Sequence, residues 1–196
     1  MKTKEVLLLL TDYWADWEAC HAIVGINMAD EYTVKTIAID NKPKISIGGM
    51  RAEIDHSISD YQDFSNTAMI ILTGSFSWGE NPYNEIADFI KKARKANVPI
   101  AAICGATIFL AKHGFLNEIK HTGDTSDYFE EELKDEPGYK GHDNFSVAQC
   151  VNDGGFITAN ETASLDFARE IFRVLKTEDD DEIDWWYNNH KHGLSS

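Results

Sequence analysis

The sequence of 196 residues lacks a long hydrophobic run. Its first apolar segment, residues 6–10, follows a short polar start. That segment is too short for the core of a signal peptide and far too short to cross a bilayer. We therefore expect a protein that is neither exported by a cleaved leader nor held in a membrane.

Cysteine is scarce, with only Cys20, Cys104 and Cys150 in the chain. An odd number of widely separated cysteines excludes a disulfide framework, and the three lack the spacing of a metal site. The seven histidines also lack ligand spacing. These features predict a chain of the reducing cytoplasm, without a metal or another cofactor.

Basic residues are few, because 18 Lys and Arg face 33 Asp and Glu for a formal net charge of −15. A strongly acidic surface repels nucleic acids and anionic membranes, so a small-molecule substrate is the expected partner. Part of the charge is local, at residues 178–182. We expect a single domain over residues 1–177, followed by an acidic, Trp-rich helix or tail at 178–196.

Short apolar segments alternate with amphipathic ones along the chain, which is typical of an α/β sandwich with a mainly parallel sheet. The expected strands are residues 6–10, 32–39, 68–72, 98–103 and 120–123, with hairpins at 45–54 and 145–159. The expected helices are residues 15–29, 82–96, 126–133, 161–175 and 181–189, together with one that follows Cys104.

Cys104 lies between an apolar strand and a helix, within the pattern Ala102-Ile-Cys104-Gly-Ala106. Small neighbours are needed at a sharp strand-to-helix turn, and a helix N-terminus favours a thiolate. The alternative is a buried cysteine that packs as a small hydrophobic residue. Because ligands bind at the carboxyl ends of parallel strands, we expect residues 11–18, 73–79 and 104–106 to meet in one site.

Three stretches together carry a family resemblance: Asp12-Tyr-Trp-Ala-Asp-Trp-Glu18 after the first strand, Leu72-Thr-Gly-Ser75, and Ala102-Ile-Cys-Gly-Ala-Thr107. They resemble the ThiJ/PfpI superfamily, which includes proteins like the Parkinsonism-associated deglycase. The resemblance implies the flavodoxin-like three-layer fold of class I glutamine amidotransferase-like proteins, with Cys104 in a nucleophile elbow. It also implies a homodimer.

The resemblance further implies that Glu18 contacts a reactive Cys104, and that backbone N–H groups of Gly74, Ser75 and Gly105 bind an oxyanion. A thiolate and a carboxylate in contact would repel, so the pair should share one proton, with neutral Glu18 donating to the thiolate. A free cysteine has a pKa of about 8.5, and we expect this arrangement to lower it. Alternatively, Glu18 is an acid favoured by the first turn of a helix.

Two departures from the family pattern narrow the expected chemistry. Proteolytic members place histidine directly after the cysteine, where this chain has Gly105. True glutamine amidotransferases carry His-x-Glu after a late strand, where this chain reads Ala159-Asn-Glu-Thr162. Without a histidine base at either place, we expect neither peptidase nor glutaminase activity.

The third member of the site is open between His121 and Asp124, both in the segment that follows the helix after Cys104. His121 could equally end a strand without a role in the site. Aromatic residues of the loops either cap the core or line a small apolar pocket. The residues concerned are Trp14, Trp17, Phe76 and Trp78.

The leading hypothesis is a cysteine-dependent hydrolase, similar to a glyoxalase or deglycase, that acts on small carbonyl compounds through Cys104. The alternative from another class is a non-catalytic oxidative-stress sensor or chaperone-like protein that signals through oxidation of Cys104. A third reading is a binding domain whose cysteine has lost its role.

Overall fold

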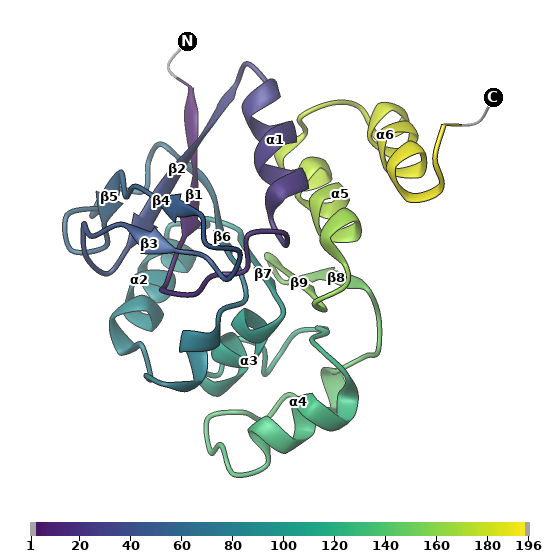
Figure 1. The fold of residues 1–196 in the computed structure, drawn as a ribbon. Coiled ribbons are helices and arrows are strands. Elements are labelled where there is room, and N and C mark those ends of the chain that lie inside the picture. Colours follow the sequence, from purple (N-terminus) through teal and green to yellow (C-terminus); the bar gives the residue numbers. More distant parts are fainter. Residues whose placement is uncertain (1–2, 195–196) are drawn as a thin grey trace.

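The computed structural model describes residues 3–194 of the chain (Figure 1). Its centre is a seven-stranded sheet in the order β5-β2-β1-β6-β7-β9-β8. Only the β8–β9 pair of this sheet is antiparallel, whereas the other neighbouring strands run parallel. The strands are β1 (Lys4–Leu9), β2 (Tyr32–Ala38), β5 (His56–Ser57), β6 (Thr67–Leu72), β7 (Ile100–Ile103), β8 (Cys150–Asp153) and β9 (Phe156–Ala159).

Helices cover both faces of the sheet, giving the three layers that the sequence predicts. One face packs against α2 (Asn84–Lys95) and α3 (Gly105–Lys112), and the other against α1 (Cys20–Met28) and α5 (Ser164–Leu175). The remaining helices are α4 (Ser126–Leu133), α6 (Asp180–His192) and the short 3-10 turns η1 (Phe76–Gly79) and η2 (His142–Asn144). None of the helices between residues 3 and 194 combines the length and apolar character needed to cross a lipid bilayer.

The first strand shows why the sheet is central. Successive side chains of a strand point to opposite faces, and here both sets are apolar. Leu7 and Leu9 join the core shared with α2 and α3, whereas Val6 and Leu8 join the core shared with α1 and α5. All four are at most 4% exposed. A continuous apolar run therefore specifies a strand buried on both sides.

Both predicted hairpins are present. β3 (Lys44–Ile45) pairs antiparallel with β4 (Arg51–Ala52) beside the main sheet. β8 and β9 are joined through Gly154 and Gly155, whose φ angles of 57° and 81° lie in the left-handed region. Glycine adopts that region without a steric penalty, so this pair of glycines closes the turn.

Several boundaries differ from the sequence prediction. α1 begins at Cys20 rather than at residue 15, because the Ala15 N–H donates to the carbonyl of Gly74 and holds the preceding loop away from the helix. α5 begins at Ser164 rather than at residue 161. Residues 120–123 form no regular strand, since only His121 makes an isolated bridge, to Phe145.

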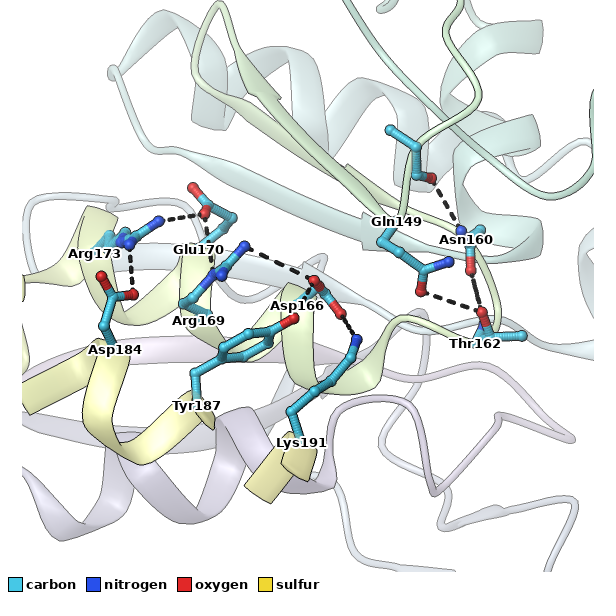
Figure 2. Close-up of polar contacts among 11 residues, drawn as sticks. Gln149, Asn160, Thr162, Asp166, Arg169, Glu170, Arg173, Asp184, Tyr187 and Lys191 are labelled. Atoms are coloured by element: carbon cyan, nitrogen blue, oxygen red, sulfur yellow. Dashed lines mark hydrogen bonds and ion pairs between the residues drawn. The ribbon is translucent and has the colours of Figure 1, made fainter. Parts of the chain in front are cut away.

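α6 is docked on α5 by a network of ion pairs and hydrogen bonds (Figure 2). Asp166 accepts hydrogen bonds from the Tyr187 hydroxyl and from Lys191 Nζ, both at 2.8 Å. Arg173 Nη2 contacts Asp184 at 2.6 Å. The acidic segment therefore forms a helix that packs on the α/β sandwich. Of the two adjacent tryptophans, Trp186 packs against the core while Trp185 is 62% exposed.

Candidate active site

Cys104 occupies a sharp turn between β7 and α3, with φ 56° and ψ −134°. A positive φ is unfavourable for a residue with a side chain, and such strain is found where a nucleophile is presented at a strand-to-helix elbow. The turn is held on both sides. The Cys104 N–H donates to the carbonyl of Ala159 at 3.0 Å, and the Thr107 hydroxyl donates to the carbonyl of Cys104 at 2.7 Å.

Glu18 is placed by the loop between β1 and α1. Ser164 Oγ, at the start of α5, donates to the Glu18 carbonyl at 3.0 Å. The carboxyl group is directed inward, with the residue only 1% exposed. Its Oε2 accepts a hydrogen bond from the Gly74 N–H at 2.5 Å, whereas its Oε1 has no nitrogen or oxygen partner.

Glu18 and Cys104 face each other across Gly74. A Cβ added to Gly74 would lie 2.8 Å from Glu18 Oε1 and 2.9 Å from Cys104 Sγ, so the absence of a side chain there lets the two groups approach. Burial raises the pKa of Glu18 to about 7, and the hydrogen bonds from Gly74 and Cys104 oppose that shift. Near neutrality, Glu18 therefore exists in both its neutral and its charged form.

Burial and the nearby charge of Glu18 also raise the pKa of the Cys104 thiol. This direction differs from the lowered value expected from the sequence, because the cysteine is partly buried among carboxyl groups. The Gly105 N–H opposes the shift by contacting the sulfur. Because two negative charges in contact are costly, the pair does not lose both protons near neutrality: the sulfur keeps its proton, and Glu18 titrates beside it.

Asp124 is a second carboxyl group beside the cysteine. Its Oδ1 accepts a hydrogen bond from the Glu161 N–H at 3.0 Å, which joins the segment after α3 to the loop after β9. Burial raises the pKa of Asp124, and a hydrogen bond with Cys104 opposes that shift. Gly123 allows this placement, since a Cβ there would lie 2.5 Å from the Phe129 ring.

His121 lies away from the sulfur and is fully buried. Its Nε2 is 2.8 Å from the Tyr139 hydroxyl and its Nδ1 is 2.9 Å from the carbonyl of Ile119. The ring also packs against Phe129 and Phe145. Of the two alternatives left open by the sequence, Asp124 is the one beside Cys104, and His121 is part of an aromatic core cluster.

A cavity of about 580 Å³ opens over Cys104. Trp17 and Phe76 line it and are 47% and 70% exposed. The other two aromatic candidates belong to the core instead. Trp14 is 6% exposed, and Trp78 stacks on Phe109 while its Nε1 donates to the carbonyl of Thr73. These two rings support the loops without facing the sulfur.

The three predicted backbone donors have different roles. The Gly74 N–H is occupied by Glu18, so it cannot also stabilise an oxyanion. The Gly105 N–H, at the start of α3, contacts the Cys104 sulfur. The Ser75 N–H lines the same cavity and has no acceptor within residues 3–194. Of the three donors, Ser75 therefore has the unoccupied N–H among the described residues, while the Gly105 N–H already contacts the sulfur.

Cys104, Asp124 and Glu161 each place a potential metal-ligating atom within 4.8 Å of the others. Within the described part of the chain, no other group of three such residues is found. The donors are one thiol and two carboxyl groups, with Glu161 exposed, whereas structural zinc is usually held by four cysteine or histidine ligands. The cluster does not fit that donor set, and we assign it no resident metal.

Sequence reasoning missed several residues of the cavity wall. Glu161 was considered only as the place of an absent histidine, although it follows β9, the parallel neighbour of β7. Its position at the carboxyl end of a strand was the available signal. Further examples come from α4 and from the segment before β8, where the sequence has no motif: Tyr128, Val147, Ala148 and Gln149.

The DJ-1/PfpI family model matches residues 4–174. The "uncharacterized protease YdeA" of Bacillus subtilis is 34% identical over 192 residues, covering 97% of this chain and 93% of the relative. The "uncharacterized protease YoaZ" of the same organism is 32% identical over 198 residues, with 97% and 92% covered.

The crystal structure of a thiJ/pfpI family protein from Bacillus anthracis is similar throughout. It superposes with a TM-score of 0.89 at 30% identity and covers 99% of this chain and 93% of its own. The family model and the relatives thus span nearly the same residues as the sheet, the elbow and the Glu18 loop. The chain belongs to the DJ-1/PfpI family.

Proposed function

We propose that the protein is a cysteine-dependent enzyme that converts small carbonyl compounds, with Cys104 as nucleophile and Glu18 as its proton partner. The observation that carries the proposal is the Glu18–Cys104 pair: a buried carboxyl group with a pKa of about 7 faces a cysteine held in a strained elbow at the base of a cavity. A proton donor whose pKa is near the working pH suits general acid–base catalysis.

The first step is addition of the sulfur to an aldehyde carbon. Charged Glu18 accepts the thiol proton, and the resulting thiolate forms a C–S bond as the carbonyl electron pair moves to oxygen. In this proposal the free N–H of Ser75 stabilises the developing negative charge, joined by the Gly105 N–H when it moves from the sulfur to the oxygen; both residues line the cavity. The proton returns from Glu18 to that oxygen, which completes a hemithioacetal and leaves Glu18 charged again.

For an α-oxoaldehyde, the hemithioacetal can rearrange to a thioester. The proton on the sulfur-bearing carbon moves to the adjacent carbonyl carbon, and the hydroxyl proton moves to the oxygen of that carbonyl. Asp124 is the carboxyl group placed to carry these protons, since it lies beside the sulfur. Water then forms the new C–O bond as the C–S bond breaks, so that aldehyde and water yield a 2-hydroxy acid.

The charge of the cavity restricts the substrate. Among residues 3–194, no lysine, arginine or histidine lines it, whereas Glu18, Asp124 and Glu161 do. An anionic substrate would therefore meet repulsion without a compensating ion pair. We expect neutral carbonyl compounds, such as methylglyoxal, to react in preference to carboxylated or phosphorylated ones.

The relatives YdeA and YoaZ are named as uncharacterized proteases. Hydrolysis of a peptide requires protonation of a leaving amine, usually by histidine next to the nucleophile. The cavity around Cys104 holds no histidine within the described residues. The site therefore supports carbonyl conversion better than peptide hydrolysis.

The decisive experiment measures loss of methylglyoxal and formation of lactate by the protein, by Cys104→Ser and by Cys150→Ser. Cys150 is the matched control because it is also partly buried but lies outside the cavity. We expect at least about a hundredfold lower turnover in the first variant, since the nucleophile is lost, and little change in the second. EDTA in the assay excludes a contribution from metal, and an unstructured peptide tests the protease alternative. Turnover that persists in Cys104→Ser contradicts the proposal.

A second candidate function is sensing of oxidants through Cys104. The observation that favours it is Glu18 Oε1, which is buried without a nitrogen or oxygen partner beside the sulfur. A protonated Glu18 could donate from this atom to a sulfinate oxygen and stabilise the oxidised cysteine. Mass spectrometry after mild peroxide treatment tests this role. A stable sulfinate at Cys104 without measurable carbonyl turnover favours the sensor.

A further inference from the structure

A second cavity, of about 590 Å³, lies between α1, α5 and α6 and does not include Cys104. Its inner wall contains Phe172 and Trp186, whose ring centroids are 5.0 Å apart. Its rim contains Val24, Met28 and Trp185, which are 59%, 79% and 62% exposed. Exposed large apolar side chains gathered around a hollow are typical of a binding surface.

Two acids line this cavity without a cationic partner. Glu178 and Glu182 form no ion pair within residues 3–194, and no lysine or arginine is among the lining residues. Several other acids of α5 and α6 are paired, such as Asp166 with Lys191 and Asp184 with Arg173. The cavity therefore carries negative charge that no lysine or arginine of residues 3–194 compensates.

The two acids and the two tryptophans lie on α6 and the segment just before it. Glu182, Trp186 and His190 are four residues apart on one stripe of the helix, because residues i, i+4 and i+8 share a face. On the opposite stripe, Asp184, Tyr187 and Lys191 contact α5 (Figure 2). One face of α6 thus docks the helix, while the other presents charge and aromatic surface to the cavity.

We propose that this cavity binds a small amphipathic organic cation, a quaternary or protonated amine that carries an apolar group. The ammonium group would lie between Glu178, Glu182 and the face of Trp185, because carboxylates and tryptophan rings both attract organic cations. The apolar group would lie against Met28 and Phe172. A hydrophobic anion would meet only repulsion there.

The walls are held in place before a ligand binds. Gly25 brings α1 close to α5, since a Cβ on it would lie 2.2 Å from Phe172 Cζ. The network around Asp166 fixes α6 on the other side of the cavity. His21 is packed edge-to-face against Trp186, and its burial lowers its pKa, so it stays uncharged near neutrality and does not repel a cation.

Isothermal titration with benzyltrimethylammonium tests the proposal, with benzyl alcohol and benzenesulfonate as neutral and anionic comparators. We expect measurable binding of the cation, at least about tenfold weaker binding of the alcohol, and none of the sulfonate. The titration is repeated with Cys104→Ser, whose affinity should be unchanged because the two cavities are separate. The protein is assayed as the full chain at low salt.

Three variants locate the ligand. Glu178→Gln with Glu182→Gln should raise the dissociation constant about tenfold, and Trp185→Leu about threefold, through loss of charge and of an aromatic face. Glu118→Gln with Glu130→Gln is the charge-matched control, since both residues are exposed and line neither cavity; its effect should stay within about twofold. Thermal melts verify that each variant is folded.

Two outcomes overturn the proposal. One is equal affinity for the cation and the alcohol, or an affinity that Glu178→Gln with Glu182→Gln leaves unchanged. The other comes from sedimentation velocity: a dimer that Trp185→Leu dissociates means that a second copy of the chain fills the cavity. Monomeric protein, or a dimer that Trp185→Leu leaves intact, agrees with a small-molecule site.

Discussion

Glu18 is the residue at which folding and chemistry conflict most directly. Burial disfavours its charged form, which raises its pKa to about 7 from an ordinary value of 4.5. An acid that ionises less readily when folded lowers the stability of the native state once the unfolded chain has ionised. This loss of stability occurs at the position where a proton donor faces Cys104.

Replacement of Glu18 by Gln should therefore stabilise the protein in a defined pH window. Below about pH 4.5, Glu18 of the wild-type protein is neutral in both the folded and the unfolded state, so the variant should have no advantage in unfolding free energy. The gain should grow as the pH rises from 4.5 to 7 and level off above, at up to about 3 kcal/mol, since one pKa unit corresponds to about 1.36 kcal/mol. Urea unfolding at pH 4.5, 6, 7 and 8 measures it. A gain of the same size at every pH contradicts this account.

Gly74 should tolerate no side chain. In Gly74→Ala the new Cβ would lie within 2.9 Å of both Glu18 carboxyl oxygens and the Cys104 sulfur, so the pair must separate. We expect a loss of about 1–3 kcal/mol in unfolding free energy and a changed rate of Cys104 alkylation by iodoacetamide. Gly79→Ala is the matched control, because an added Cβ there has no neighbour within 4 Å. Similar behaviour of the two variants would count against the close approach.

The site was only partly predictable at this scale. The small residues around Cys104 predict the elbow, because a sharp turn between strand and helix excludes larger neighbours. The choice between His121 and Asp124 was open, since the sequence does not give the conformation of the two residues between them. The structure separates their roles: Asp124 is beside the sulfur, whereas His121 bonds to Tyr139.

At the scale of elements, α6 depends on a few polar contacts with α5. Asp166, with a side chain 9% exposed, is the centre of this interface. Burial alone would raise its pKa, but hydrogen bonds from Lys191 and Tyr187 outweigh burial and lower it. A buried carboxylate with two good donors contributes more than an exposed pair, because solvent screens the latter.

Asp166→Asn should therefore loosen α6 while the sheet remains intact. We expect a loss of about 1–3 kcal/mol and faster hydrogen exchange confined to α6, since Lys191 loses its charged partner. The control is Asp88→Asn, which removes an exposed pair with Lys91 on α2 and should cost no more than a few tenths of a kcal/mol. Uniform exchange throughout the chain would show instead that α6 does not open separately.

Elements with a clear apolar or amphipathic pattern were predicted correctly in type, whereas the first residue of some elements, such as α1, was predicted wrongly. The run of residues 6–10 matches β1 and the helix at 126–133 matches α4, because apolar runs and amphipathic spacing report burial directly. The start of α1 was wrong because Ala15 bonds to Gly74, 59 residues away, which no local pattern reveals. β5, only His56–Ser57, was missed because a two-residue strand has no period.

For the whole molecule, charge should decide which reagents reach the sulfur. The net charge is −15, and the described residues that line the cavity over Cys104 include three acids and no basic side chain. Iodoacetate should react with Cys104 about ten times more slowly than iodoacetamide, relative to the same two rates in the urea-unfolded chain. Part of this difference should disappear in 1 M salt, which screens the surface charge.

The two alkylation rates are measured in the double variant Cys20→Ser with Cys150→Ser, so that only Cys104 reacts. The alkylated protein is quantified by its intact mass. An equal ratio of the two rates in the folded and unfolded states would show that the acids around the cavity do not select against anions. The same selectivity should appear among carbonyl substrates, where neutral methylglyoxal would react faster than glyoxylate.

The sequence by itself determined the layers, the elbow and the family, because burial periodicity, small residues and local motifs act over a few neighbours. Only the tertiary structure decided which distant groups meet at Cys104 and how they share protons. The absence of a side chain at Gly74 lets Glu18 approach the sulfur, and its absence at Gly123 allows the placement of Asp124 beside the same atom. The pKa of each group depends on burial and on neighbours far along the chain, and these exist only once the sheet has assembled.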